Sequence, residues 1–307
     1  MPTYNCNFIS RAISSVLKQT FNNWELIVID NFSKNNTEEI INKYNDNRIR
    51  YFKFNNEGII AKSRNYGIKL STSEWIAFLD SDDFWIEKKL ETCFQSIKKN
   101  NHDLYYHGLY QAKEGLNLIK KKIIDKSRTL SIPIFKNLLI NGNAIGNSSV
   151  VVRKSLLYKI NLISEDKNKY SWEDFDTWLR LSQITEKFFY INKILGYYWI
   201  GKGRASNPEQ IIKNYKLIKI YYGNFLKKDL VNAHRFYWID YHFAVINFKK
   251  KKYKTAYIFS KNIKITPSKT GLIIFIIRIF FLKTLIFNTF LKFFLIIKKF
   301  LLKIFSK

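Results

Sequence analysis

The sequence predicts an α/β fold with a mostly parallel sheet flanked by helices. Short apolar runs alternate with amphipathic runs along much of the chain. The runs Leu26–Ile29 and Trp75–Leu79 are apolar at every position, which is typical of strands buried on both faces. Each run leads directly into an aspartate, Asp30 or Asp80. Open α/β sheets bind ligands at the carboxyl ends of their strands, so these two positions are the first candidates for a site.

The expected elements alternate along the chain. Strands are predicted at residues 25–30, 49–54, 75–79 and 103–110, and helices at 36–44, 60–70 and 86–99. Further along we expect a strand at 149–153, a helix at 172–183, two short strands within 188–200 and three helices within 209–261. The domain boundaries that follow are an α/β domain at 1–205, a helical extension at 206–265 and basic amphipathic helices at 266–307.

Composition narrows the class of protein. Hydrophobic residues make up 47% of the 307 residues, which excludes a wholly disordered chain. Two cysteines exclude a disulfide framework and a multi-cysteine zinc site. Lys and Arg number 52 against 24 Asp and Glu, a net charge of +28. Such a charge favours nucleic acid, an anionic membrane or phosphate-bearing ligands as partners, although the amino-acid drift of an AT-rich genome also explains part of it.

The last predicted region, residues 271–307, is apolar but regularly interrupted by basic residues. No uninterrupted apolar run reaches the roughly 20 residues that a spanning helix needs. On a helical wheel one side gathers polar residues, namely Arg278, Asn288, Thr289, Lys292, Lys299, Lys303 and Ser306. This pattern predicts a helix lying in an anionic membrane interface. The alternative is a core helix that packs on the preceding helical section.

The start of the chain, MPTYNCNF, has neither the basic segment nor the apolar segment of a secretory signal. We therefore expect a cytoplasmic protein, held peripherally on the inner face of the cell membrane by its C-terminal region.

The acidic run Asp80-Ser81-Asp82-Asp83 is the most informative motif. Carboxylates crowded at a strand end repel one another, and a hard divalent cation relieves that repulsion. Mg²⁺ or Mn²⁺ held by one or two carboxylates keeps coordination positions open for substrate phosphates. Asp82 and Asp80 are the predicted metal ligands. The alternative is a solvated turn with a helix cap.

Two further residues are candidates for nucleotide contacts. Asp30 ends its strand and could accept hydrogen bonds from a ribose or a base, although an aspartate at this point also starts turns. Arg64 lies in the predicted helix that precedes the Asp80 strand, and its planar fork suits a base or a diphosphate. The alternative for Arg64 is an ordinary surface arginine. We expect Asp30 and Asp80 at the same edge of the sheet.

A second acidic pair, Glu173 and Asp174, opens the amphipathic helix predicted at 172–183. Negative charge at a helix start is electrostatically favourable, so helix capping is one explanation. The functional explanation is a general base at the rim of a pocket, with Asp174 taking the proton of an acceptor hydroxyl.

Taken in order, these motifs resemble the family 2 glycosyltransferases, which have the Rossmann-like GT-A fold. The resemblance covers about residues 1–205. The matching segments are Pro2-Thr3-Tyr4-Asn5, residues 12–20, Trp24 to Ser33, Asn56-Glu57-Gly58, residues 63–68, Asp80-Ser81-Asp82-Asp83 and Glu173-Asp174-Phe175-Asp176.

The resemblance implies roles for individual residues. Thr3, Asp30 and Arg64 would contact the nucleotide, and Asp80 would lie near the ribose and diphosphate. Asp82 would bind the metal, and Asp174 would be the catalytic base of an inverting transfer, supported by Glu173. The donor implied is a nucleotide-sugar, with a UDP-sugar expected, and the acceptor is a lipid-linked or cell-surface glycan that receives a single sugar.

Two departures from the family pattern, at the first strand and at Asn31, leave alternatives open, and a third observation indicates the non-processive type. The family shows an apolar strand ahead of Pro2-Thr3-Tyr4-Asn5, whereas this sequence starts at Met1, so we expect a truncated first strand. Asn31 stands where many members carry a carboxylate, and the Gln-x-x-Arg-Trp segment of processive members is absent. A catalytically impaired, membrane-bound relative is one alternative. A basic nucleic-acid-binding protein is another, but the predicted strands are buried on both faces rather than lined by exposed lysines and aromatics, so no nucleic-acid partner is expected.

Overall fold

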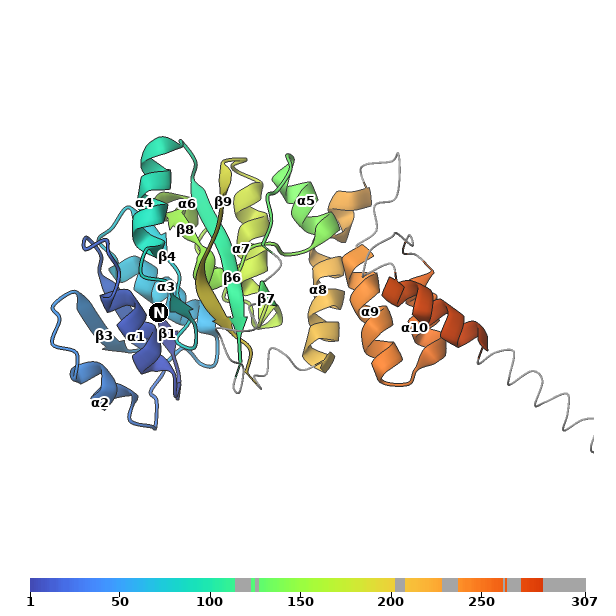
Figure 1. The fold of residues 1–307 in the computed structure, drawn as a ribbon, viewed down its shortest axis with the longest axis horizontal. Helices are drawn as coiled ribbons and strands as arrows, with labels where there is room; N and C mark the ends of the chain where they lie inside the picture. Colours follow the sequence, from blue (N-terminus) through green and yellow to red (C-terminus); the bar gives the residue numbers. More distant parts are fainter. Residues whose placement is uncertain are drawn as a thin grey trace, which may run out of the picture. The chain divides into compact units, whose positions relative to one another are not determined.

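The computed structural model describes residues 1–113, 123–124, 127–201, 208–227, 237–261, 263 and 272–283. The chain divides into two compact units, Met1–Gly223 and Asn224–Lys307, which are treated separately below. The first unit contains two β-sheets with their helices (Figure 1). The second unit is helical in its described part.

The first sheet is parallel and has the order β1-β2-β3. Its strands are β1 (Pro2–Thr3), β2 (Leu26–Asp30) and β3 (Ile49–Lys53), and the helices between and after them are α1 (Ile9–Leu17), α2 (Thr37–Asn42) and α3 (Ile60–Leu70). Every residue of β2 is buried, as its unbroken apolar run predicts. Ile9, Ile13 and Val16 lie one helical turn apart on α1 and pack with Val28 of β2.

The second sheet has the order β4-β8-β6-β9-β5, with β7 paired to β6. Its strands are β4 (Trp75–Ala77), β5 (Phe84–Trp85), β6 (Leu104–Ala112), β7 (Ile123–Ile124), β8 (Val151–Arg153) and β9 (Phe188–Trp199). Only β6 and β9 run parallel, and the other pairs are antiparallel. The prediction of a mostly parallel sheet therefore holds for the first sheet and is wrong for the second. The apolar pattern of a strand reports its burial, but not the direction of its neighbours.

One long strand, β9, replaces the two short strands expected within 188–200. Its pairing with β6 shifts register on both sides of Gly108, so the strand continues through an irregularity that the sequence pattern marks as a break. A side chain at Gly108 would lie 3.1 Å from Ile194, which explains why glycine occupies this close approach. Asp30 is the last residue of β2 in the first sheet, whereas Asp80 follows β4 in the second sheet. The expectation that both lie at the edge of one sheet is therefore wrong.

Strands β1 and β4 are the edge strands of their respective sheets. A cavity of about 380 Å³ lies between them, lined by Met1 and Ile27 on the first sheet and by Trp75 and Ile76 on the second. Neither Asp80 nor Asp82 lines this cavity, but Leu79, which immediately precedes Asp80, and Arg64 do.

The remaining helices of the first unit are α4 (Lys89–Lys99), α5 (Ile134–Asn141), α6 (Lys154–Lys159), α7 (Glu173–Ser182) and α8 (Pro208–Lys227), which runs across the unit boundary. Of these, α4, α7 and α8 lie where helices were predicted, whereas α5 and α6 were not predicted. Helix α3 has the predicted bounds, whereas α4 begins three residues later than expected. The three helices predicted within 209–261 are α8, α9 (Tyr237–Lys249) and α10 (Tyr253–Ser260).

The second unit packs α9, α10 and a helix over residues 272–283 around a small apolar core. Ile274 and Ile277 of the last helix are buried there against Ala244 and Ala256. Arg278 donates hydrogen bonds to the carbonyl oxygens of Ser260 and Ile263 at the end of α10. Residues 272–283 thus pack on the preceding helices, as in the alternative prediction, and Arg278 lies on the packed side of this helix instead of on an exposed polar side. The rest of the predicted amphipathic segment, residues 284–307, lies outside the described residues.

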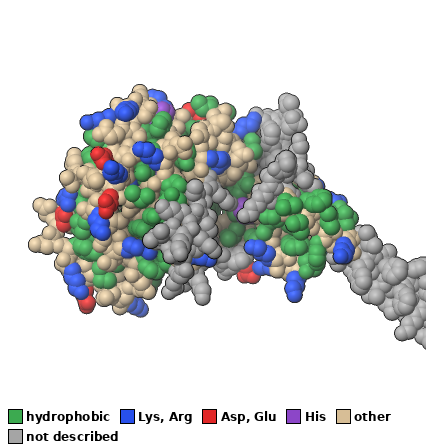
Figure 2. Space-filling view, viewed as in Figure 1, with side chains coloured by type: hydrophobic (Ala, Val, Ile, Leu, Met, Phe, Trp, Pro, Cys, Tyr) green, Lys and Arg blue, Asp and Glu red, His purple; other side chains and the backbone are tan. Residues whose placement is uncertain are grey.

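The opposite face of the 272–283 helix is apolar and exposed, and hydrophobic side chains cover much of this unit in Figure 2. The exposed residues are Leu272, Phe275, Ile276, Ile279, Phe280 and Leu282. Among the described residues, no helix is long and apolar enough to cross a membrane.

Candidate active site

The acidic turn, Asp80 to Asp83, connects β4 to β5. The turn closes through the Asp83 N–H, which donates to the Asp80 carbonyl oxygen at 3.0 Å. The buried side chains of Phe78 and Leu79 anchor the segment that leads into it. Three carboxylates are thereby confined to one short turn, where their negative charges repel one another.

Arg64 of α3 joins the acidic turn to the start of α7. Its guanidinium is buried, with Nη2 donating to Asp80 Oδ1 at 2.8 Å and Nη1 donating to Glu173 Oε1 at 2.6 Å. The structure therefore brings together three of the residues that sequence reasoning selected. Both terminal nitrogens of Arg64 are engaged with carboxylates, which fixes the guanidinium between the turn and α7.

Asp82 differs from its neighbours because no other described residue forms a hydrogen bond with its carboxylate. Its side chain is partly exposed. Partial burial, together with the nearby Asp80 carboxylate, raises the pKa of Asp82 to about 6. At neutral pH the group is mostly ionised, and a cation beside it would relieve the remaining repulsion.

Asp83 is buried and serves to hold the turn in place. Ser148 Oγ donates to Asp83 Oδ2 at 2.6 Å, and the Trp199 backbone N–H donates to Asp83 Oδ1 at 2.7 Å. The same Ser148 oxygen accepts from the Asp80 N–H at 3.0 Å. Burial, followed by the charges of Asp80 and Asp82, raises the pKa of Asp83 well above its ordinary value. Ser148 therefore ties both ends of the turn together.

Two more side chains secure the turn, and sequence reasoning identified neither. Asn147 Nδ2 donates to Asp80 Oδ1 at 3.0 Å. Arg11 Nη2 donates to the Asp82 carbonyl oxygen at 2.6 Å, and its guanidinium lies 4.3 Å from the centre of the Phe84 ring. No pattern in the sequence points to these contacts, because Arg11 and Asn147 lie about 70 residues from the turn on opposite sides of it.

The acidic pair at the start of α7 contains one engaged and one available carboxylate. Glu173 is buried and held by Arg64. Asp174 is partly exposed, and its Oδ1 accepts from the Phe175 N–H at 2.7 Å, while its Oδ2 accepts no hydrogen bond from a described residue. Burial raises the pKa of Asp174 to about 7, the Glu173 charge adds to the rise, and Arg64 opposes it. A carboxylate with this pKa can accept a proton near neutral pH.

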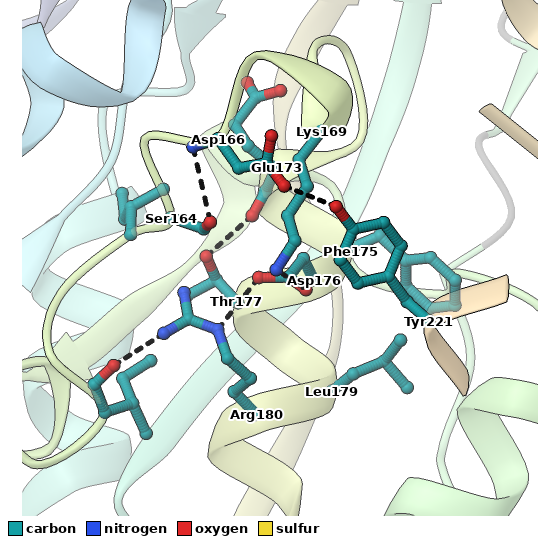
Figure 3. A network of polar contacts seen from close by, with 12 residues as sticks. Ser164, Asp166, Lys169, Glu173, Phe175, Asp176, Thr177, Leu179, Arg180 and Tyr221 are labelled. Atoms are coloured by element: carbon teal, nitrogen blue, oxygen red, sulfur yellow. Dashed lines mark hydrogen bonds and ion pairs between the residues drawn. The ribbon is translucent and has the colours of Figure 1, made fainter. Parts of the chain in front are cut away.

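Helix α7 is held by Asp176, the last residue of the acidic motif that resembles the family and a fully buried carboxylate. Asp176 pairs with Lys169 Nζ at 2.8 Å and with Arg180 Nε at 2.8 Å (Figure 3). It also accepts from the Tyr222 hydroxyl at 2.6 Å. Two cations and a hydroxyl satisfy this buried charge, which fixes the first turn of α7 and with it Asp174.

Thr3 and Asp30, predicted to contact the nucleotide, lie opposite each other in the β1–β2 pair. Both are buried, and the Thr3 hydroxyl has no partner among the described residues. Asp30 accepts from Ser33 Oγ at 2.5 Å and from the Tyr51 hydroxyl at 2.8 Å. These two residues form a pair at the carboxyl end of the first sheet, and no described contact joins them to the acidic turn.

The predicted divalent ion can be tested against the side chains present. In the described residues no group of three or more His, Cys, Asp or Glu residues forms a ready-made metal cage. Magnesium, however, binds to proteins through one or two carboxylates and takes its other ligands from water and substrate phosphates. The unpartnered Asp82 carboxylate, beside Asp80, supplies the oxygen donors of such a site. The residues present therefore fit a divalent ion of this kind.

Comparison with known proteins identifies the family. The model described as glycosyl transferase family 2 matches residues 1–163. The chain belongs to glycosyltransferase family 2. An Escherichia coli relative, UDP-Glc:alpha-D-GlcNAc-diphosphoundecaprenol beta-1,3-glucosyltransferase WfgD, is 32% identical over 254 residues, which are 81% of this chain and 92% of WfgD. The poly(ribitol-phosphate) beta-N-acetylglucosaminyltransferase TarP of Staphylococcus aureus is 34% identical over 181 residues, 57% of this chain and 51% of TarP.

Among solved structures, residues 1–349 of S. aureus TarS in complex with UDP-GlcNAc resemble this family 2 glycosyltransferase with a TM-score of 0.58. The sequences are 21% identical, and the likeness covers 89% of this chain and 77% of the TarS chain. The resemblance to family 2, the GT-A-like α/β fold and the glycosyltransferase activity predicted from the sequence are thereby confirmed.

Proposed function

We propose that this glycosyltransferase transfers a single sugar, with inversion, from a UDP-sugar to a lipid-linked or cell-surface glycan in a reaction that depends on Mg²⁺ or Mn²⁺. One observation carries the proposal. Both acidic motifs contain carboxylates that protein groups hold, namely Asp80 and Asp83 in the turn and Glu173 in α7. Each motif also leaves carboxylate oxygens that no described residue binds, those of Asp82 in the turn and Oδ2 of Asp174 in α7. A UDP-sugar donor is supported by the name of WfgD, which includes UDP-Glc, and by the TarS structure, which is a complex with UDP-GlcNAc.

On the donor side, different residues would bind the divalent ion and the nucleotide. Asp82, with Asp80, would hold the divalent ion, and Thr3, Asp30 and Arg64 would contact the nucleotide. When bound, the ion supplies positive charge that stabilises the departing diphosphate. Arg64 and Arg11 keep the acidic turn in place through Asp80 and the Asp82 carbonyl, so its carboxylates are positioned before the donor arrives.

On the acceptor side, Asp174 takes the proton from the attacking hydroxyl, with Glu173 in a supporting role. The acceptor oxygen then forms a bond to the anomeric carbon, the bond from that carbon to the UDP oxygen breaks, and the electron pair leaves with UDP. The proton remains on Asp174. The pKa of about 7 suits this transfer, because a base is most effective when its pKa lies near the working pH.

A direct assay tests this function. The full chain is incubated with a panel of UDP-sugars and soluble acceptor analogues, and released UDP and glycosylated product are measured with added Mn²⁺, with Mg²⁺ and with excess chelator. We expect transfer with one donor and its loss with chelator. Full activity in chelator would overturn the metal assignment, and absence of any donor turnover would favour the catalytically impaired alternative.

We also propose that the protein acts at the inner face of the cell membrane and binds anionic lipid through the exposed apolar face of the 272–283 helix. On the buried side of this helix, Ile274 and Ile277 pack in the apolar core and Arg278 donates hydrogen bonds to backbone carbonyl oxygens. Its exposed side presents six large apolar residues, and the nearby turn between α9 and α10 carries the exposed lysines Lys251 and Lys252. Apolar insertion combined with basic charge suits an anionic interface.

Vesicle sedimentation tests the membrane proposal. Replacing Ile276 and Ile279 together with Glu should reduce binding to vesicles containing phosphatidylglycerol at least tenfold, since each apolar side chain withdrawn from water contributes about 1.5–3 kcal/mol. The matched control is Ile184→Glu, an equally exposed isoleucine of the first unit. Unchanged sedimentation of the double variant would exclude this helix face as the anchor.

A further inference from the structure

A second cavity, of about 580 Å³, lies between the start of α3, the loop that precedes α7 and the first turn of α8. We call it the α3–α7 cavity. Its walls are formed by Glu57, Gly58, Ile59, Ile60, Ala61, Ser164, Asp166, Lys167, Lys169, Tyr170, Glu173 and Gln210. Figure 3 shows the loop residues Ser164, Asp166 and Lys169 beside Glu173. The volume lies in the range of small-molecule binding sites, and more than half of the lining residues are polar or charged.

Two groups at this cavity have hydrogen-bonding capacity that the protein leaves unused. Glu173 is 7% exposed, and its Oε2 has no partner in the described part of the chain, although its Oε1 is held by Arg64. A buried carboxylate oxygen of this kind requires a hydrogen-bond donor, such as a hydroxyl.

The second group is the start of α3, where no side chain caps the helix. No hydrogen bond is made by the backbone N–H groups of Ile60 and Ala61 within the described residues. Free N–H groups and the helix dipole favour an anionic oxygen, such as that of a phosphate.

Apart from Glu173, most charged side chains of the cavity are paired within the protein. Glu57 pairs with Lys62, Asp166 accepts from the Tyr221 hydroxyl, and Lys169 pairs with Asp176. Lys167 is exposed and has no ion-pair partner among the described residues. Lys167, whose charge is also felt by Glu57, and the start of α3 therefore offer positive charge to a ligand, whereas Glu173 Oε2 offers a hydrogen-bond acceptor.

We propose that the α3–α7 cavity binds the phosphate-bearing sugar of the acceptor, an inference that rests on the proposed glycosyl transfer. Lys167 and the start of α3 contact the phosphate, and Glu173 Oε2 accepts a hydrogen bond from a sugar hydroxyl. A sugar phosphate supplies both the donors that Glu173 requires and the acceptors that the helix start requires.

The cavity is coupled to the reaction centre by short contacts. Arg64 spans from Glu173 at the cavity wall to Asp80 of the acidic turn, so one guanidinium separates the two. The proposed base, Asp174, is the next residue after Glu173 on the first turn of α7. An acceptor anchored in the cavity therefore has its reactive hydroxyl held near Asp174, and Glu173 takes part in acceptor binding as well as in positioning Arg64.

The diphosphate of the donor offers the same phosphate oxygens as the acceptor, so the experiment measures acceptor binding and donor binding separately. The KM values for a UDP-sugar and for a soluble alkyl diphosphate of N-acetylglucosamine are measured for Lys167→Ala, for Gln210→Ala and for the control Lys187→Ala, an exposed lysine away from the cavity. We expect Lys167→Ala to raise the acceptor KM about tenfold or more, as for a hydrogen bond to a charged group, with an unchanged donor KM. A smaller rise is expected for Gln210→Ala and none for Lys187→Ala.

Binding without turnover provides an independent measurement. N-acetylglucosamine 1-phosphate is titrated into the full chain in the absence of donor and followed by calorimetry, and Lys167→Ala should weaken its binding to the same degree as it raises the acceptor KM. A rise in donor KM instead, or unchanged acceptor binding in Lys167→Ala, would overturn the cavity assignment. If the wild-type protein transferred no sugar, the proposed function would fail, while the titration would still decide whether the cavity binds a sugar phosphate.

Discussion

The acidic turn and the start of α7 both place an available carboxylate beside carboxylates that the protein holds, but the groups that hold them differ. The turn holds Asp80 and Asp83 and leaves Asp82 available, and the start of α7 holds Glu173 and leaves Oδ2 of Asp174 available. Asp83 is held by neutral donors, the Ser148 hydroxyl and the Trp199 N–H, whereas Glu173 is held by the cation Arg64. The neutral donors fix Asp83 without supplying positive charge, and the pKa of Asp83 is raised well above its ordinary value. Arg64 supplies positive charge to Glu173 and also to Asp80 of the turn, so one guanidinium orients a carboxylate of each motif and leaves Asp82 and Asp174 without an ion pair among the described residues.

The turn should be the more sensitive of the two regions. Replacing Asp82 with Asn removes the available carboxylate of the turn and should abolish Mn²⁺- or Mg²⁺-dependent transfer while leaving the melting temperature unchanged. Metal binding measured by the paramagnetic signal of free Mn²⁺ checks the cause without turnover. The matched control is Asp46→Asn, which alters a surface ion pair with Arg48. Normal metal binding by Asp82→Asn would assign the ion to other residues.

At the start of α7, Asp174→Asn should lower the rate of transfer on the order of 10² to 10⁴, the usual loss on removing a positioned general base. Donor binding and the melting temperature should be retained. Glu173→Gln should lose less turnover, because the amide still fills the same space beside Arg64. If Glu173→Gln proved the more damaging change, the roles of the two carboxylates would be reversed.

The pH profile sharpens the same comparison. Asp174 must be ionised to accept a proton, and its pKa is raised to about 7, so kcat/KM should fall about tenfold per pH unit below that value. Asp82, with a pKa raised to about 6, should add a second fall at lower pH that is absent from profiles recorded at saturating metal. A rate that stays constant down to pH 5 would show that no group with a raised pKa limits the reaction.

The smallest effect is expected from the support of the turn. Ser148→Ala removes the hydroxyl that joins the Asp80 N–H to the Asp83 carboxylate, and should lower stability by about 1–3 kcal/mol because a buried carboxylate oxygen loses its donor. Mn²⁺ affinity should fall as the turn loosens. Ser149→Ala is the control, since that buried hydroxyl donates only to the nearby Gly146 carbonyl oxygen. Equal metal affinity in both variants would make Ser148 purely structural.

Much of the candidate site is readable from the sequence because its parts are local. The acidic turn follows an apolar strand, and the Glu173–Asp174 pair opens an amphipathic helix. Both motifs can therefore be predicted from the residues next to them in the sequence. Arg64 also stands out within its helix, although the sequence assigns it to the nucleotide and the structure shows it bridging Asp80 and Glu173. The roles of Asn147 and Ser148 could not be predicted, since their partners are remote in the chain. Asp176 belongs to the motif found in the sequence, but its complete burial is seen only in the structure.

The sequence by itself determined most of the elements, the two acidic motifs and the family to which the chain belongs, because periodicity, caps and strand ends are properties of short segments. It did not predict α5 and α6, and it divided β9 into two strands. Only the tertiary structure decided the direction of the strands in the second sheet and the hydrogen bonding of Arg278 to the end of α10. It also decided which carboxylates of each acidic motif are held by other residues. Those outcomes depend on contacts between segments that lie tens of residues apart. A buried charge takes whichever partner the fold brings within hydrogen-bonding distance, and that choice is made by packing.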